Sequence, residues 1–114
     1  MRRAGALAGL AGALAVHGGA ALAQDAAGGD PAAGRKIAST ICQSCHGLDG
    51  LAKMPEMPTI AGADAAYLQR QLEAYQNGSR QNEMMSAVAP MLDKKKMEDV
   101  AAYYAAVKVT AEPP

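Results

Sequence analysis

The scarcity of large aromatic side chains is the feature that most constrains what this chain can fold into. None of its 114 residues is Phe or Trp, four are Tyr, and much of its 50% hydrophobic content is alanine. A domain this small buries little apolar surface and often needs a disulfide, a metal or another cross-link. We therefore expect something other than side chains to fill the centre of the fold, and a large, flat, apolar cofactor would do so.

The first 23 residues have the pattern of a secretory signal peptide. The charged start MRR is followed by an apolar run and by the small-x-small cleavage site Ala21-Leu22-Ala23. The alternative is a retained membrane anchor, because residues 4–23 carry no formal charge and are about long enough to span a bilayer. That run is mostly Ala and Gly, however, with few Leu. We predict cleavage after Ala23, export to the periplasm and no membrane span in the mature chain.

Cleavage there would leave one domain of 91 of the 114 residues. Because Arg2 and Arg3 leave with the signal, nine of the 11 basic residues remain against 11 acidic ones, a net charge of −2. This charge, without a dense basic region, argues against nucleic acid as a partner.

The mature chain is predicted to be all-α, with about four helices. A polar, Gly-rich lead-in covers residues 24–29, the domain covers 30–109, and 110–114 form a loose tail. Each helix is expected where a capping residue precedes an apolar stripe of helical period. The expected helices run from Asp30-Pro31 into the cysteines, from Asp64 to Gln76 before Asn77-Gly78, over 83–88 with Pro90 closing it, and from Asp93 to Val107. Residues 47–63 contain Pro and Gly without a clear period and are expected to form a loop.

The two cysteines of the chain lie in the segment ICQSCHG, together with the single histidine left after cleavage. A dithiol redox motif would be expected beside a βαβ pattern, and this chain has no segment typical of a strand. A zinc site usually takes four Cys or His ligands, or three plus water, and here three lie in one local turn. Both interpretations leave part of the cluster without a role.

Covalent haem attachment gives all three residues a role. In a helix, positions i, i+3 and i+4 project to the same side. Cys42 and Cys45 can therefore both reach the vinyl groups of one porphyrin edge, and His46 can bind the iron from the proximal face. The pattern Cys-x-x-Cys-His is typical of c-type haem attachment.

A second axial ligand has to come from another residue type, because no second histidine remains. The mature methionines are Met54, Met57, Met84, Met85, Met91 and Met97. Met97 fits the apolar face of the last helix as core, and Met54 and Met57 are close to the proximal side in sequence. Met84, Met85 and Met91 follow His46 at a distance long enough to reach the distal side, and spacing does not separate Met84 from Met85.

Several blocks, in order, resemble the class I cytochrome c family: GRKIASTICQSCHGLDG, MPTIAG, YLQRQLEAYQNGSRQNEMM and MEDVAAYYAAV. The resemblance covers about residues 31–107. It is strongest to small bacterial periplasmic monohaem cytochromes and to single domains of dihaem ones. It implies an all-α class I cytochrome c fold, in which about four helices pack around one covalently attached haem c.

The resemblance also implies roles for individual residues. Cys42 and Cys45 match the attachment points, His46 the proximal ligand and Met85 the axial methionine, with Met84 as the alternative. Pro58 matches the proline whose carbonyl accepts the imidazole Nδ1–H, a bond that orients the ring. Gly34, Val100 and Tyr103 match the residues where the first and last helices cross.

Three further positions concern the surroundings of the haem. Tyr67 and Arg80 match positions near the haem or its propionates, although helix packing and a solvated charge are the alternatives for them. Ala63 stands where this branch often has Gln, so a polar contact near the haem is expected to be absent.

A haem with His and Met ligands has no open position for a substrate, so we expect an electron carrier and not an enzyme. Redox proteins are the expected partners, either membrane oxidase or reductase complexes or a periplasmic dehydrogenase. A dedicated cytochrome subunit of such a dehydrogenase is the alternative, and a haem enzyme or gas sensor with an open distal site is less favoured. The run Lys94-Lys95-Lys96 is interpreted as a solvated helix face, with a docking site for an acidic partner as the alternative.

Overall fold

The computed structural model describes Gly5, Gly9, Gly12 and residues 28–114. Apart from those three glycines, the predicted signal peptide lies outside the described residues, and so do residues 24–27 of the predicted lead-in. No helix within the described part is long and apolar enough to cross a membrane. The described residues form helices joined by loops and contain no strand.

The first helical segment is continuous but changes its geometry before the cysteines. It consists of α1 (Pro31–Ile37), the π-helical turn η1 (Ala38–Cys42) and α2 (Gln43–His46). As predicted, Asp30 caps it, because its Oδ1 accepts a hydrogen bond from the Ala32 amide at 2.9 Å. The amide of Gln43 donates to the carbonyl of Ala38, five residues back, so the expected regular helix takes in one additional residue here.

The remaining helices are α3 (Ala65–Asn77), α4 (Met85–Val88), the 3₁₀ turn η2 (Ala89–Met91) and α5 (Lys94–Ala105). Asp64 and Asp93 cap α3 and α5 through hydrogen bonds of 2.8 Å to backbone amides. Gly78 ends α3 in the left-handed conformation, with φ of +83°. Both of these helices therefore begin as the sequence predicts, and α5 ends two residues earlier than Val107.

The expected short helix over 83–88 starts later than predicted. The side chain of Asn82 accepts hydrogen bonds from the amides of Met84 and Met85, each at 3.0 Å, and so holds the residues before α4 in a turn. Pro90 does not follow a completed helix end but lies inside η2. A proline is compatible with the first turn of a helix, because the amides there have no intrahelical partner.

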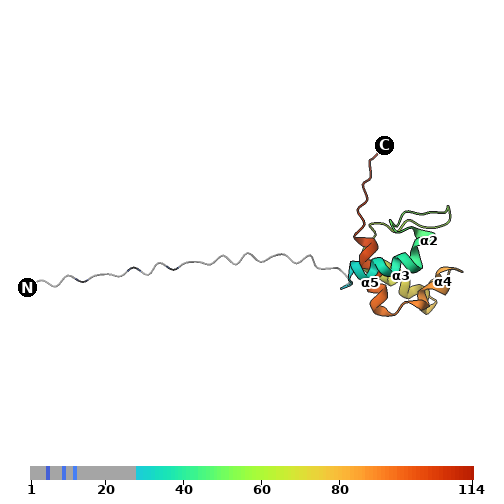
Figure 1. The fold of residues 1–114 in the computed structure, drawn as a ribbon, viewed down its shortest axis with the longest axis horizontal. Coiled ribbons are helices and arrows are strands. Elements are labelled where there is room, and N and C mark those ends of the chain that lie inside the picture. The colour runs from blue at the N-terminus through green and yellow to red at the C-terminus, as the bar shows by residue number, and fades with distance from the viewer. Residues whose placement is uncertain (1–4, 6–8, 10–11, 13–27) are drawn as a thin grey trace, which may run out of the picture.

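The core lies where α1 crosses α5, which Figure 1 shows as cyan against orange and red. A Cβ added at Gly34 would overlap the Asp99 carbonyl and lie 2.8 Å from Tyr103 Cβ, so glycine allows the backbones to approach. This is the crossing that the resemblance implies. Leu92 and Met97 are the largest fully buried side chains of the described residues, and α3 packs against α5 beside them.

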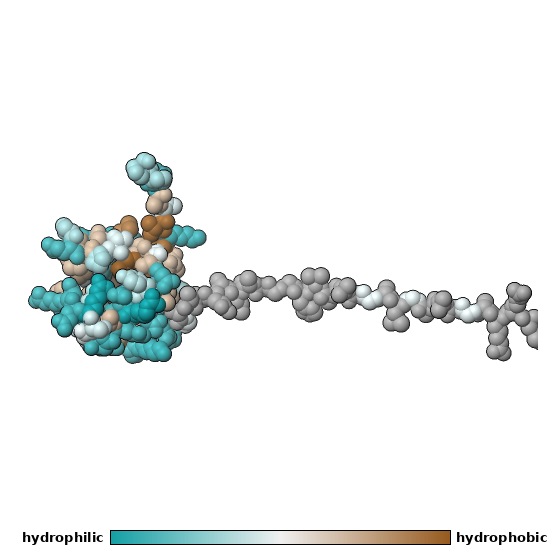
Figure 2. Space-filling model, turned by 180° about the vertical axis from the view of Figure 1, so that it is seen from behind, coloured by the Kyte–Doolittle hydropathy of each residue, from teal (hydrophilic) through white to brown (hydrophobic). Residues whose placement is uncertain are grey.

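The face seen from behind is mostly hydrophilic, and its hydrophobic residues gather near the base of the C-terminal tail (Figure 2). Val109 lies in this tail, 54% exposed, and its Cγ2 is 3.3 Å from the position that a Cβ on Gly62 would take. The tail thus leaves the domain beside the loop between α2 and α3.

Candidate functional site

The two thiols lie within one helical turn. Cys42 ends η1 and Cys45 lies in α2, and both are free and partly buried. Burial raises the pKa of Cys42 to about 11. The pair is therefore open to covalent attachment, with the Cys42 thiol on the interior side of the helix.

His46 is the last residue of α2, and a backbone carbonyl of the following loop holds its imidazole ring. The residue is 7% exposed, and its Nδ1 lies 3.0 Å from the carbonyl oxygen of Pro58. A carbonyl only accepts hydrogen bonds, so this geometry assigns the proton to Nδ1 and leaves the Nε2 lone pair free to bind a metal. The contact is the one that the resemblance implies for Pro58.

The backbone that follows His46 is tied to α5 by two neighbouring phenols. Tyr104 donates to the Gly47 carbonyl at 2.9 Å, and Tyr103 donates to the Leu48 carbonyl at 2.6 Å. Their rings meet edge to face, with centroids 5.0 Å apart. The resemblance places Tyr103 in the helix crossing, and neither hydroxyl has a role predicted from the sequence. The signal was present, since a buried phenol usually finds an acceptor.

The loop from Gly47 to Ala63 closes on itself between these ties. The Gly50 carbonyl accepts from the amides of Ile60 and Ala61, at 2.8 and 3.1 Å. Asp49 pairs with Lys53 at 2.9 Å, and this contact lowers the pKa of the Asp49 carboxyl. The loop thereby carries Pro58 back towards His46.

The methionines differ in exposure. Met97 is 1% exposed, which agrees with its predicted place in the core. Met84 is 54% exposed, whereas Met85 is partly buried as the first residue of α4. Figure 1 shows α2 and α4 on the same side of the molecule. No hydrogen bond among the described residues joins the Met85 side chain to the cysteine turn.

Tyr67 and Arg80 lie on and after α3. Tyr67 is 47% exposed, so it is not packed into the core as one interpretation has it. The Arg80 guanidinium donates to Gln71 Oε1 at 2.7 Å and lies 4.7 Å from the centre of the Tyr75 ring. Arg80 is therefore exposed, as a solvated charge would be, and is anchored to α3.

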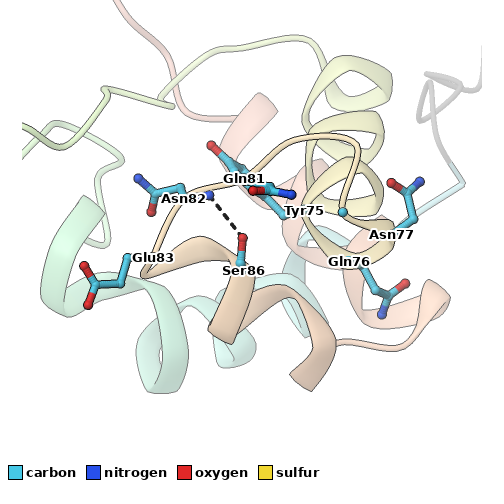
Figure 3. A pocket seen from close by; sticks show the side chains of 8 residues that line it. Tyr75, Gln76, Asn77, Gln81, Asn82, Glu83 and Ser86 are labelled. Carbon is cyan, nitrogen blue, oxygen red and sulfur yellow. Dashed lines mark hydrogen bonds between the residues drawn. The ribbon is translucent and has the colours of Figure 1, made fainter.

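A polar hollow of about 680 Å³ lies between the end of α3 and the start of α4 (Figure 3). The dashed line in the figure marks the 3.1 Å bond from the Asn82 amide to the Ser86 hydroxyl. None of its lining residues is a predicted site residue, and none offers a thiol or an imidazole. The hollow is lined by Tyr75, Gln76, Asn77, Gly78, Gln81, Asn82, Glu83 and Ser86.

The residues fit a haem group in their donor set and in what they leave uncovered. Two free thiols and an imidazole with a free Nε2 share one turn. Large apolar side chains on separate segments are also strongly exposed: Leu51 at 46%, Met54 at 43%, Tyr67 at 47% and Met84 at 54%. Exposed apolar side chains of this size are of the kind that a large apolar cofactor would cover.

A sequence model of the family described as Cytochrome c matches residues 31–108 of this chain. The chain belongs to the cytochrome c family. It is 38% identical over 79 residues to cytochrome c-554(548) of Halomonas halodenitrificans, a match that covers 67% of this chain and 94% of the relative. It is 36% identical over 70 residues to a Stutzerimonas stutzeri protein named thiosulfate dehydrogenase electron acceptor, covering 60% of this chain and 32% of that protein.

The solved structure of reduced cytochrome c4 from Pseudomonas stutzeri has the same fold. It matches this cytochrome with a TM-score of 0.65 and 32% identity, over 70% of this chain and 46% of that one. The all-α class I cytochrome c fold and the similarity to single domains of dihaem cytochromes are thereby confirmed. This chain spans about two fifths of the cytochrome c4 relatives it matches, 41% of the length in Pseudomonas aeruginosa.

Membership of the family also settles the cofactor. This cytochrome carries haem c, attached covalently through Cys42 and Cys45, and c-type cytochromes are proteins of electron transfer. The dithiol switch and the zinc site are therefore excluded for these cysteines, since both sulfurs are used in thioether bonds.

Proposed function

We propose that this protein is a periplasmic monohaem electron carrier, and not an enzyme, in which His46 and Met85 are the two axial ligands of the haem iron. The observation that carries the proposal is the 3.0 Å contact between His46 Nδ1 and the Pro58 carbonyl. It fixes the tautomer, orients the ring and raises the basicity of Nε2. Haem c supplies an iron centre that gains and loses one electron.

The role of Met85 rests on its place and its partial burial. Met84 and Met85 share the cap from Asn82, but Met84 is 54% exposed and Met85 is partly buried. A thioether ligand favours ferrous iron and raises the reduction potential. With side chains on both axial positions, no position is open to a substrate, which supports electron transfer as the activity.

The ligand assignment is tested with Met85→Ala beside Met84→Ala in matured holoprotein. We expect Met85→Ala to lose the far-red charge-transfer band that marks a bond from Met to ferric iron, and Met84→Ala to keep it. The pair is well matched, since both residues precede or begin the same short helix. A Met85→Ala protein that keeps the band would contradict the assignment.

A dedicated subunit of a periplasmic dehydrogenase is the second candidate. It is favoured by the relatives named thiosulfate dehydrogenase electron acceptor. Co-purification of the natively expressed protein with a catalytic chain would support it, whereas recovery as a free cytochrome supports the carrier. A haem enzyme or gas sensor requires an open iron position, which rapid binding of carbon monoxide to the native ferrous protein would reveal.

We also propose that Tyr67 and Arg80 lie near the haem or its propionates. The anchoring of Arg80 by Gln71 and Tyr75 supports this role, because it holds the guanidinium in one place. Export to the periplasm is proposed from the signal-peptide pattern of residues 1–23. The intact mass of the mature protein checks it, since cleavage after Ala23 leaves Gln24 as the first residue.

A further inference from the structure

One residue of α5, Tyr104, is hydrogen-bonded near both ends of the loop that carries Pro58. The Tyr104 hydroxyl donates to the carbonyl of Gly47, directly after His46, and the Tyr104 carbonyl accepts from the amide of Gly62 at 2.9 Å. These two bonds reach the beginning and the end of the loop, and Pro58 lies between them. The geometry of the His46–Pro58 contact therefore depends on both ends of the loop being held.

We propose that Tyr104 is a positioning residue for the proximal ligand, and that its hydroxyl holds His46 and the Pro58 carbonyl in register. The inference rests on the proposed function, in which His46 binds the iron. No hydrogen bond among the described residues joins Tyr104 to the imidazole. Tyr104 acts through the Gly47 peptide, which is the covalent continuation of His46.

The hydroxyl of Tyr104 is enclosed in the interior, with the Cys42 sulfur as the other polar group near it. The residue is 2% exposed, and burial raises the pKa of its phenol, which keeps the O–H intact as a donor. The ring also packs against the loop, since a Cβ on Gly50 would lie 2.9 Å from Tyr104 Cδ1. Gly47 has a φ of +75°, a conformation in which the chain turns out of α2. The bond to Gly47 thus fixes the turn at the point where the chain leaves the imidazole.

Tyr103 offers a matched control on the same helix. Its hydroxyl also donates to the loop, to the Leu48 carbonyl at 2.6 Å, but one residue farther from His46. Its own carbonyl accepts from the Ala106 amide at the end of α5, and not from the loop. Replacing either tyrosine by Phe removes one hydroxyl and keeps the ring, so the comparison isolates the position of the hydrogen bond.

The test compares matured wild-type, Tyr104→Phe and Tyr103→Phe holoproteins by proton NMR and by reduction potential. In Tyr104→Phe we expect the His46 Nδ1 proton to exchange about tenfold faster, because one net hydrogen bond that holds its acceptor is lost. We also expect a higher potential, because a looser bond to Pro58 makes the imidazole a weaker electron donor to iron. Tyr103→Phe should change both quantities less, even where it lowers the melting temperature.

Unchanged exchange and potential in Tyr104→Phe, or equal changes in both variants, would overturn the positioning role. Failure of the proposed function would look different, because the wild-type protein would then lack the hyperfine-shifted resonances of an iron-bound His46. If Tyr104→Phe does not mature, 3-fluorotyrosine at position 104 makes the phenol a stronger donor. Slower exchange of the Nδ1 proton then supports the proposal, and unchanged exchange contradicts it.

Discussion

The crossing of α1 and α5 is built in the opposite way to the loop after α2 and the segment before α4. In the crossing, side chains fill the space, with Met97, Val100 and Ala101 at most 3% exposed. In the loops, Leu51, Met54 and Met84 are between 43% and 54% exposed. The described chain thus fills its own core at the crossing, whereas these three apolar side chains stay uncovered.

The polar contacts differ in the same way. In the crossing, the buried Asp99 carboxylate accepts from the Asp30 amide at 2.8 Å and from the Lys95 ammonium, and so ties the start of α1 to α5. In the proximal loop, side chains from α2 and α5 meet backbone carbonyls of Gly47, Leu48 and Pro58. A charge holds the crossing, whereas neutral hydrogen bonds to the backbone shape the haem site.

The largest effect should come from removing the cofactor altogether. We expect the double variant Cys42→Ser/Cys45→Ser to lose most of its helical circular dichroism and its cooperative melt, because the aromatic-poor core does not hold so small a domain alone. Ser44→Ala in the same motif is the control and should melt like the wild type. A cooperative melt of the double variant near the wild-type temperature would show that the crossing suffices without haem.

A smaller loss should follow from breaking the crossing while the haem is kept. Gly34→Val would force its side chain into the Asp99 backbone, so we expect a loss of about 3 kcal/mol in the free energy of unfolding. Ala32→Val, on the exposed side of α1, should cost only about 0.6 kcal/mol through helix propensity. Denaturant unfolding of the two holoproteins measures both, and equal losses would mean that the close approach at Gly34 does not matter.

The smallest effect concerns the charge that holds the crossing. Burial raises the pKa of Asp99, but the Asp30 amide and Lys95 outweigh it, so the folded-state pKa is lowered. Its contribution is therefore present above the unfolded pKa of about 3.9 and is lost as pH falls through the folded value. We expect Asp99→Asn to lose about 1.5 kcal/mol at pH 7 and to show less further loss in acid than the wild type.

Glu98→Gln is the control for this last comparison. Glu98 pairs with Lys94 at 4.0 Å, and the Lys94 side chain is 80% exposed, so the pair should contribute about 0.3 kcal/mol or less. Unfolding free energies of both variants from pH 7 to acid decide the matter. Parallel pH profiles for Asp99→Asn and the wild type would show that Asp99 does not hold the crossing by its charge.

The parts that the sequence predicted well depend on local rules. Asp30, Asp64 and Asp93 cap helices because a carboxylate before an apolar stripe accepts hydrogen bonds from the free amides of the first helical turn. Gly34 matched the position where the first and last helices of the family approach closely. The Lys94–Lys96 run was interpreted as a solvated helix face, and the pairs of Lys94 with Glu98 and of Lys95 with Asp99 were not predicted. Two of its three charges are thereby engaged within α5.

The parts that the sequence did not predict depend on contacts between distant residues. The Tyr104 bond to Gly47 joins positions 57 residues apart, and nothing in the local pattern of either segment specifies it. The start of α4 was missed because Asn82 Oδ1 accepts from the amides of Met84 and Met85, the bonds of a helix N-cap that the sequence analysis did not assign to Asn82. In both cases a side-chain polar group, and not hydrophobic periodicity, decides the backbone.

The π turn at Ala38–Cys42 has a consequence for how such a domain can change. In a regular helix each residue adds about 100° of rotation, so the side of the helix that faces α5 would dictate where the thiols point. Because η1 takes in an additional residue, the packing of α1 against α5 no longer dictates the direction of the thiols. Deleting one residue there should rotate the attachment motif away from its cofactor while α1 stays packed. The π turn thus sets the rotation of α2 relative to α1, so that the helix crossing and the haem-attachment motif can be altered independently.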